Sequence, residues 1–142
     1  MTNILHALKN IVENPITDIS AHYRVNGRNR ANNMGEALES YVKDLFCNTF
    51  EIESNTEKNK IYSKEFSYIG NQNNPPDMIV AGGDAIEVKK IESMGSQIAL
   101  NSSYPKNKLY ADSPMITQDC RECENWREKI LFISLEQCNK TN

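Results

Sequence analysis

The fold is decided by one stretch, Pro76-Asp77-Met78-Ile79-Val80-Ala81-Gly82-Gly83-Asp84-Ala85-Ile86-Glu87-Val88-Lys89. Two short segments that are rich in apolar residues, 77–81 and 85–91, flank a glycine-rich break. This pattern predicts two strands joined in a hairpin. Because strand side chains alternate between faces, Glu87 and Lys89 are expected on one side of the second strand.

The length of the turn decides whether Asp77 shares that side. A three-residue loop at residues 82–84 pairs Ile79 with Glu87 and Asp77 with Lys89, so that Asp77 lies diagonal to Glu87 on the same face. A two-residue loop moves Asp77 to the opposite face, because a slip of one residue inverts the pattern. A common site therefore requires the longer loop or a bulge of equal effect.

Two carboxylates and a lysine on one face suit metal-dependent chemistry on a phosphate. Asp77 and Glu87 can bind Mg²⁺, which prefers oxygen ligands and keeps several of its waters. A bound metal acidifies water, and the Lys89 ammonium can orient that water or stabilise the transition state. The alternative is a surface hairpin with a solvated Glu87–Lys89 pair. Apolar residues on the reverse face of the second strand favour the metal site, because they turn Glu87 and Lys89 away from that core layer.

Length and composition predict one globular domain. The chain has 142 residues, of which 39% are hydrophobic and 25% charged, which is ordinary for a soluble protein. We expect a helical segment at about 1–46 and a catalytic sheet with a DNA-facing segment at about 50–135. No stretch approaches the ~20 apolar residues that span a bilayer, and the N-terminus lacks the features of a signal peptide. A cytoplasmic location is predicted.

The charge distribution is more informative than the net charge of −3, which argues against a protein that merely coats DNA. Residues 19–35 and 93–111 contain no acidic residue. Both are candidate phosphate-facing segments, with solvated loops as the alternative. Their basic residues are Arg24, Arg28, Arg30, Lys106 and Lys108.

Hydrophobic periodicity predicts the remaining elements. Before the hairpin we expect a helix over 3–13, a polar loop over 20–32, a helix from an Asn33 cap to about Phe46, a strand over 50–53, a loop over 54–60 and an edge strand over 61–69. After it we expect no regular element over 93–110, a helical turn over 124–129 and a buried strand over 129–135.

Cys120 and Cys123 have the spacing of half a zinc site. A structural zinc needs four ligands, and the sequence has no second pair of that kind. Partly buried thiols are therefore favoured over a zinc site, and disulfides are not expected in a cytoplasmic chain.

The hairpin resembles the PD-(D/E)XK nuclease superfamily, since Pro76-Asp77 is followed after nine residues by Glu87-Val88-Lys89. That superfamily often carries an acidic residue on the helix before the sheet. Glu39 fits this position because it flanks the apolar stripe of its predicted helix, and Glu36 is the other candidate. A solvated glutamate is the alternative for either residue.

Three segments, residues 29–39, 87–92 and 99–106, resemble the NgoPII-type restriction endonucleases. The resemblance implies an α/β fold with a mixed β-sheet flanked by helices, and Mg²⁺-dependent cleavage of double-stranded DNA at GGCC. It also implies a homodimer and a cognate DNA methyltransferase as functional counterpart. With the basic segments above, it predicts DNA contacts from Arg28, Arg30, Asn101, Ser102, Ser103, Lys106 and Lys108.

The family resembled consists of longer proteins, which implies that this chain is truncated at its C-terminus or is a fragment. A shortened sheet loses outer strands and part of the DNA-reading surface. Two alternatives to a type II restriction endonuclease therefore stay open. One is a catalytically silent remnant that binds DNA without cutting it. The other is a nuclease of the same superfamily that acts on repair or recombination intermediates.

Overall fold

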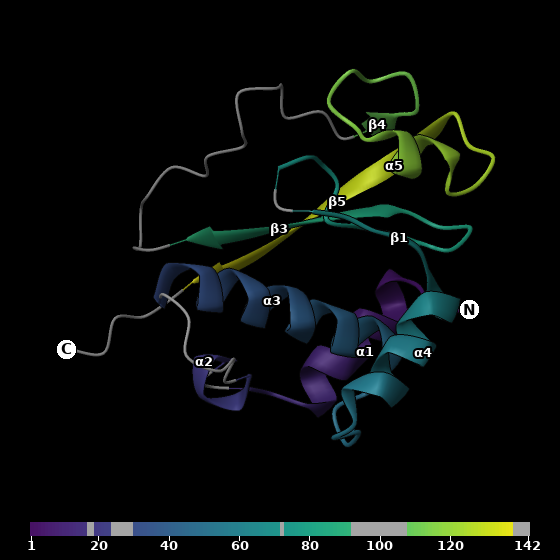
Figure 1. The fold of residues 1–142 in the computed structure, drawn as a ribbon. Helices are drawn as coiled ribbons and strands as arrows, with labels where there is room; N and C mark the ends of the chain where they lie inside the picture. The colour runs from purple at the N-terminus through teal and green to yellow at the C-terminus, as the bar shows by residue number, and fades with distance from the viewer. Residues whose placement is uncertain (17–18, 24–29, 72, 92–107, 138–142) are drawn as a thin grey trace. The chain divides into compact units, whose positions relative to one another are not determined.

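The computed structural model describes residues 1–16, 19–23, 30–71, 73–91 and 108–137 (Figure 1). The chain divides into two compact units, Met1–Ser67 and Tyr68–Asn142. Helices and a mixed five-stranded sheet are present, which confirms the predicted α/β class. Within the described ranges, no helix is both long and apolar enough to cross a membrane.

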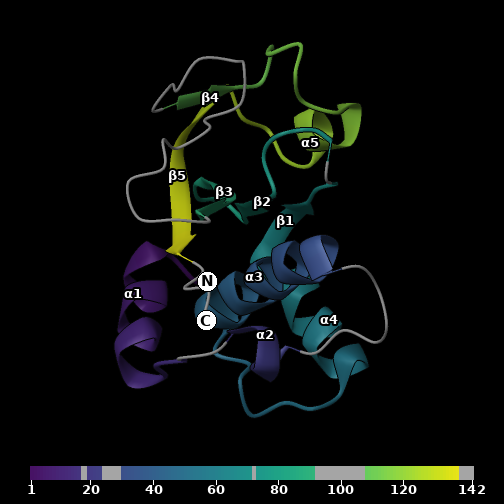
Figure 2. The ribbon, with the colours of Figure 1, turned by 90° about the vertical axis from the view of Figure 1, so that its left-hand side faces the viewer.

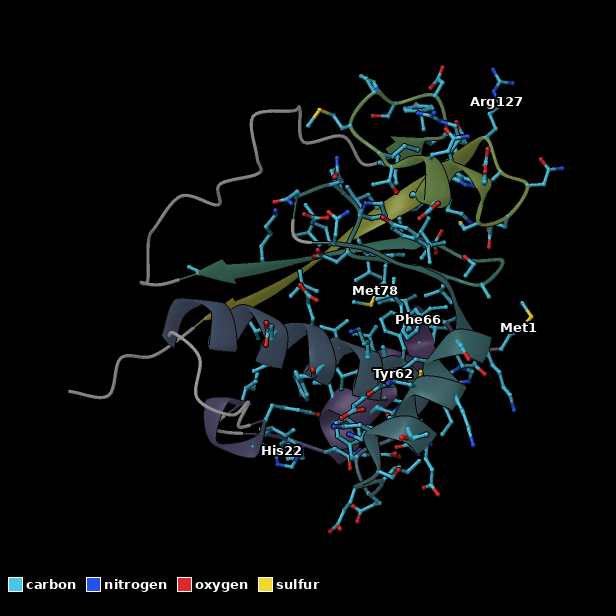
Figure 3. All side chains as sticks on the ribbon, viewed as in Figure 1. Met1, His22, Tyr62, Phe66, Met78 and Arg127 are labelled. Carbon is cyan, nitrogen blue, oxygen red and sulfur yellow. The ribbon has the colours of Figure 1, made fainter. Side chains whose placement is uncertain are left out.

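The first unit is built around its longest helix, and its other helices pack on that one (Figure 2). Its helices are α1 (Ile4–Glu13), α2 (Ile19–His22), α3 (Arg30–Cys47) and α4 (Asn55–Glu65). The predicted first helix is confirmed, with Asn3 as its N-cap accepting hydrogen bonds from two backbone N–H groups. Aromatic rings fill part of the core, among them those of Tyr62 and Phe66 (Figure 3). The ring centroid of Phe66 lies 6.3 Å from that of Tyr62 and 6.0 Å from that of Phe46.

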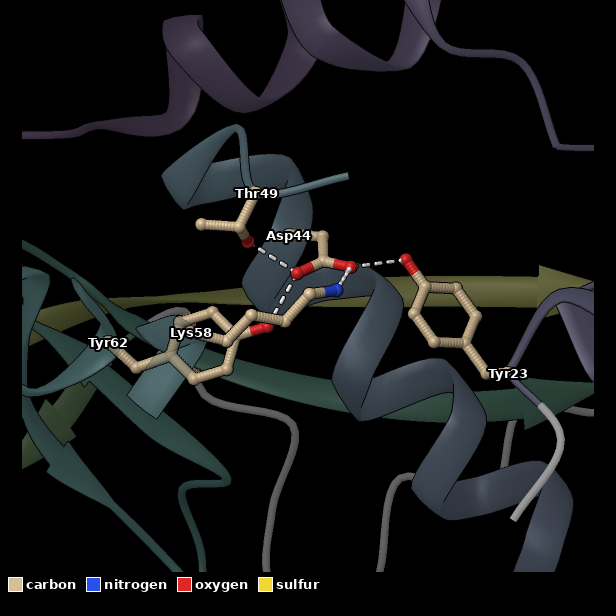
Figure 4. A network of polar contacts seen from close by, with 5 residues as sticks. All are labelled: Tyr23, Asp44, Thr49, Lys58 and Tyr62. Atoms are coloured by element: carbon tan, nitrogen blue, oxygen red, sulfur yellow. Dashed lines mark hydrogen bonds and ion pairs between the residues drawn. The ribbon is translucent and has the colours of Figure 1, made fainter. Parts of the chain in front are cut away.

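A buried carboxylate on α3 joins this helix to α4 and to Tyr23, which directly follows α2. The Asp44 side chain is fully buried and accepts hydrogen bonds from Tyr23 Oη (2.6 Å), Thr49 Oγ1 and Tyr62 Oη (Figure 4). Lys58 Nζ pairs with it at 2.8 Å. Burial alone raises the pKa of Asp44, but the four donors outweigh it and lower the pKa below its ordinary value. The carboxylate therefore stays ionised inside the unit.

Several predicted elements and bounds of this unit are wrong. The long helix begins at Arg30, three residues before the predicted Asn33 cap, and α2 extends into the start of the predicted loop over 20–32. Helix α4 replaces the predicted loop over 54–60 and the first half of the predicted strand over 61–69, and residues 50–53 form no strand. The reason is an N-cap: the Ser54 hydroxyl accepts a hydrogen bond from the Glu57 N–H at 3.4 Å, which stabilises the start of a helix.

The second unit holds most of a mixed sheet. The strands are β1 (Phe66–Ile69), β2 (Met78–Val80), β3 (Ala85–Ile91), β4 (Lys108–Tyr110) and β5 (Glu128–Gln137). They are ordered β1-β2-β3-β5-β4. Strands β2 and β3 are antiparallel, β3 and β5 are parallel, and β4 runs antiparallel to β5. The predicted hairpin and the predicted strand over 85–91 are confirmed.

The core of the second unit lies on one face of this sheet. Ile79 and Ala85, which pair across the hairpin, are fully buried in a cluster that also contains Tyr68, Leu109 and Cys120. Met78 and Ile86 on the other face are buried as well. Both faces of the hairpin are therefore apolar next to the turn, and Asp77, Glu87 and Lys89 lie toward its opposite end.

The prediction for the last third of the chain is partly wrong. The helix there is α5 (Gln118–Glu122), capped by Thr117, and not a turn over 124–129. Strand β4 lies within the segment 93–110, where no element was predicted, and residues 92–107 lie outside the described residues. Strand β5 is present as predicted, but it is not uniformly buried, because Lys129 is 8% exposed and Ile130 50%.

Candidate active site

The hairpin turn sets which residues of β2 and β3 face each other. Val80 N–H donates to Asp84 O (3.0 Å), Gly83 N–H donates to Val80 O (2.8 Å), and Gly82 has a φ of 68°, which glycine adopts without strain. The loop therefore consists of residues 81–83. It has the predicted length of three, but it begins one residue earlier than predicted.

This turn changes the predicted pairing. Ile79 pairs with Ala85 and not with Glu87, and continuing the register places Asp77 directly opposite Glu87 instead of diagonal to it. Directly opposed residues of an antiparallel pair share a face. The observed register thus differs from the predicted one in its pairing partners, but it still places the carboxylates of Asp77 and Glu87 on one side of the sheet.

The backbone of β3 holds the first carboxylate. Val88 N–H donates a hydrogen bond of 2.6 Å to Asp77 Oδ2. An amide bonded to a charged acceptor makes a stronger contact than a neutral pair. Strand β3 therefore supplies Glu87 and Lys89 as side chains and also an anchor for the carboxylate of Asp77.

The second carboxylate, that of Glu87, has a partner for only one of its two oxygens. Lys89 Nζ lies 2.8 Å from Glu87 Oε1, and the two side chains are only 19% and 12% exposed. Glu87 Oε2 is the one buried side-chain polar atom among the described residues that has no hydrogen-bond partner. Leaving a buried charged oxygen unpartnered is costly, so this atom has the capacity to accept a donor or a metal ion.

These groups fit a hard divalent cation. The free oxygen of Glu87 and the nearby carboxylate of Asp77 are ligands that Mg²⁺ accepts, and Mg²⁺ is commonly held by one or two carboxylates with waters in the other positions. Over the described ranges, no cluster of three or more His, Cys, Asp or Glu residues could hold a metal ion. The protein would thus supply two carboxylates here, with open positions for water and a phosphate oxygen.

The segment before Asp77 is fixed by a close backbone approach. The Pro75–Pro76 peptide is cis, and Gly70 N–H donates to Asp77 O at 2.7 Å. A Cβ atom on Gly70 would lie 2.5 Å from Pro76 O and 3.0 Å from Tyr68 Cε1. Only glycine fits at position 70 without moving the backbone that carries Asp77.

We expect Gly70→Ala to lower the free energy of unfolding by about 1–3 kcal/mol, the usual cost of overpacking a closed site. Unfolding in urea, followed by the fluorescence of Trp126 in the same unit, measures this loss. Gly35→Ala is the matched control, because nothing lies within 4 Å of a Cβ there, and alanine is favoured in a helix by roughly 1 kcal/mol. Equal stability of the Gly70→Ala variant and the wild type would contradict the close approach.

The remaining predicted site residues are not all placed. Glu39 and Glu36 lie on α3 in the first unit, and both are partly exposed. Lys108 on β4 is exposed and pairs with Glu128 at 2.7 Å. Arg30 begins α3, and its side chain lies outside the described residues. Also outside them are Arg28, Asn101, Ser102, Ser103 and Lys106.

The CxxC pair is part of the core. Cys120 is fully buried, and Cys123 packs against the same cluster. Burial raises the pKa of the Cys120 thiol to about 12, so the thiol stays protonated near neutral pH. Cys120 is therefore a small apolar side chain on the buried face of α5.

Sequence reasoning missed the groups that position the site. The Val88 amide and Gly70 act through the backbone, and no side-chain pattern reveals such a role. Lys129 contacts the hairpin turn from β5, and Glu124 contacts it from the segment before β5. The one feature of the sequence that indicates such a role for Lys129 is that this charged residue stands at the start of an apolar strand.

Comparison with known proteins places the chain in a family. The family model described as NgoPII restriction endonuclease matches residues 2–141. The chain belongs to the NgoPII restriction endonuclease family. The resemblance found in three separate segments is thereby confirmed over nearly the whole sequence.

One curated relative within this family is the "Type II restriction enzyme NgoPII" of Neisseria gonorrhoeae. It is 49% identical to this chain over 132 residues, which cover 92% of the chain and 46% of the relative. The chain thus spans about half the length of this relative. No solved structure matches this chain significantly.

Proposed function

We propose that this chain carries the metal-dependent nuclease core of a type II restriction endonuclease, which hydrolyses phosphodiester bonds of double-stranded DNA. One observation carries the proposal: Glu87 has a buried oxygen without a partner, next to Lys89 and on the face of Asp77. The family membership supports it, as does the name of the relative, a type II restriction enzyme.

The site residues have distinct proposed roles. Asp77 and Glu87 would hold Mg²⁺, which when bound acidifies water and offsets charge on the phosphate. The Val88 amide keeps Asp77 oriented. Lys89 neutralises one oxygen of Glu87 and presents its ammonium to the attacking water or to the charge that develops on the phosphate. Glu39 is the proposed auxiliary acidic residue.

The finer proposals follow from the family resemblance. The target is GGCC, and a palindromic target is met most simply by a two-fold symmetric homodimer. Phosphate and base contacts come from the two segments without acidic residues, through Arg28, Arg30, Asn101, Ser102, Ser103, Lys106 and Lys108. A cognate methyltransferase protects the host DNA, and both proteins act in the cytoplasm.

The protein is expected to cut a duplex that contains GGCC in Mg²⁺, and to leave intact a duplex with GCGC in the same flanks. Gel analysis of end-labelled duplexes measures the cut and maps its position. Excess EDTA should abolish cleavage, because two carboxylates alone cannot activate water. Equal cutting of both duplexes would contradict the proposed specificity, and cutting in EDTA would contradict the metal site.

A second candidate is a DNA-binding remnant without activity. The observation that favours it is the chain's span of 46% of its relative. Binding of the GGCC duplex in Ca²⁺ without cleavage in Mg²⁺ would support this candidate.

A further inference from the structure

A closed ring of polar contacts surrounds the hairpin turn. The turn's own hydrogen bonds use Val80, Gly83 N–H and Asp84, and the Gly82 N–H and the Gly83 carbonyl bond to side chains outside the hairpin. Gly82 N–H donates to Glu124 Oε2 at 3.0 Å, and Lys129 Nζ donates to Gly83 O at 2.6 Å. Lys129 and Glu124 also form an ion pair with each other.

This ion pair is nearly removed from solvent. The side chains of Lys129 and Glu124 are 6% and 21% exposed, and the Lys129 ammonium lies 5.7 Å from the centroid of the Trp126 ring. Burying such a pair seldom stabilises a fold more than apolar residues of the same size would. Its best attested benefit is to select one arrangement among several.

The hairpin needs such a selection. A turn with two adjacent glycines fits loops of different length, and a slip of one residue would turn Asp77 away from Glu87. The two contacts together allow only one conformation of the turn. The Gly82 N–H must donate to Glu124 at the same time as the Gly83 carbonyl accepts from Lys129. Lys129 lies on β5, whose Leu131 pairs with Ala85 of β3, so the contact also ties the turn to the neighbouring strand.

We propose that Glu124 and Lys129 are positioning residues that clamp the β2–β3 turn and thereby set the register that places Asp77 opposite Glu87. The importance of this register for catalysis rests on the proposed function. The register itself does not, and it has its own reporter: the Val88 N–H reaches Asp77 Oδ2 only when the two strands are aligned as described.

The test compares amide hydrogen exchange in Lys129→Met, Glu124→Gln and Lys129→Arg with that in the wild type. We expect Lys129→Met and Glu124→Gln to lower protection of the Val88 amide about tenfold or more, relative to the overall change in stability. Lys129→Arg keeps a donor for Gly83 O and should retain most of the protection of the Val88 amide. Glu124→Gln removes the negative charge that holds the Lys129 ammonium at the turn, and it decides the matter alone if Lys129→Met does not fold.

Two controls separate positioning from general loss of stability or charge. Ile116→Val trims the same core, and Lys9→Met removes one charge from an exposed pair of the first unit. Neither should change Val88 protection beyond the global change. Unchanged Val88 protection in the two clamp variants, or a loss no greater than in Ile116→Val, would overturn the proposal.

Mn²⁺ binding by titration calorimetry supplies the link to the metal. Lys129→Met should bind Mn²⁺ about tenfold more weakly, as expected when a group that positions metal ligands is lost. Wild-type affinity in this variant would overturn the positioning role. Equal Mn²⁺ affinity in the wild type and in Asp77→Asn would instead refute the proposed metal site, while the Val88 measurement would still report on the register.

Discussion

Replacing Lys89 with alanine is expected to slow DNA cleavage by about 10²- to 10³-fold, the usual loss when one preorganised donor to the transition state is removed. The ammonium lies 2.8 Å from Glu87 Oε1 and is largely buried, so water cannot fully replace it. The effect should fall on the chemical step. Single-turnover cleavage of a GGCC duplex in saturating Mg²⁺ measures it.

Two further measurements make this prediction specific to the site. Binding of the duplex in Ca²⁺ should stay close to wild type, because Lys89 is assigned to the reaction and not to the recognition of bases. Lys90→Ala is the matched control, because it removes the same charge one position along β3. Wild-type cleavage by Lys89→Ala would reduce the Glu87–Lys89 pair to an ordinary structural contact.

The sequence predicted the hairpin well but misplaced its turn. Alternating apolar residues defined the strand over 85–91, because periodicity is a local property. The position of the loop is not local, since adjacent glycines permit more than one turn. It is fixed by Glu124 and Lys129, which meet Gly82 and Gly83 from 42 and 46 residues along the chain. Pairwise contacts at such separation leave no periodic trace in a sequence.

The error at α4 has a different origin. Ser54 and Glu57 have the spacing of a helix cap, so a local signal was present. The aromatic residues that follow, among them Tyr62 and Phe66, favoured a strand instead. They are buried in the first unit's core, Tyr62 from a helix and Phe66 from a strand, so packing decided the outcome where propensity was ambiguous. The orphaned oxygen of Glu87 could not be predicted either, because burial of single atoms depends on the whole fold.

Replacing Asp44 with alanine is expected to cost about 3–5 kcal/mol of stability, because one partner of a buried ion pair is lost and the other is left uncompensated. Lys58 is only 15% exposed on its side chain. Tyr23, Thr49 and Tyr62 lose their acceptor in the same step. Urea unfolding followed by far-UV circular dichroism, which reports mainly on the first unit's helices, measures the loss.

The pH dependence tests whether the charge itself carries this stability. The pKa of Asp44 is lowered on folding, so its contribution is fully present above the unfolded value of about 3.9 and disappears as pH falls through the folded value. The gap in free energy of unfolding between the wild type and Asp44→Asn should therefore begin to narrow as pH falls below the unfolded value, and it should go on narrowing as pH falls through the folded value. Glu13→Ala, which breaks the exposed Lys9–Glu13 pair, should cost less than about 0.5 kcal/mol. A gap that stays constant with pH would mean that the hydroxyl contacts, and not the ionised carboxylate, hold α2, α3 and α4 together.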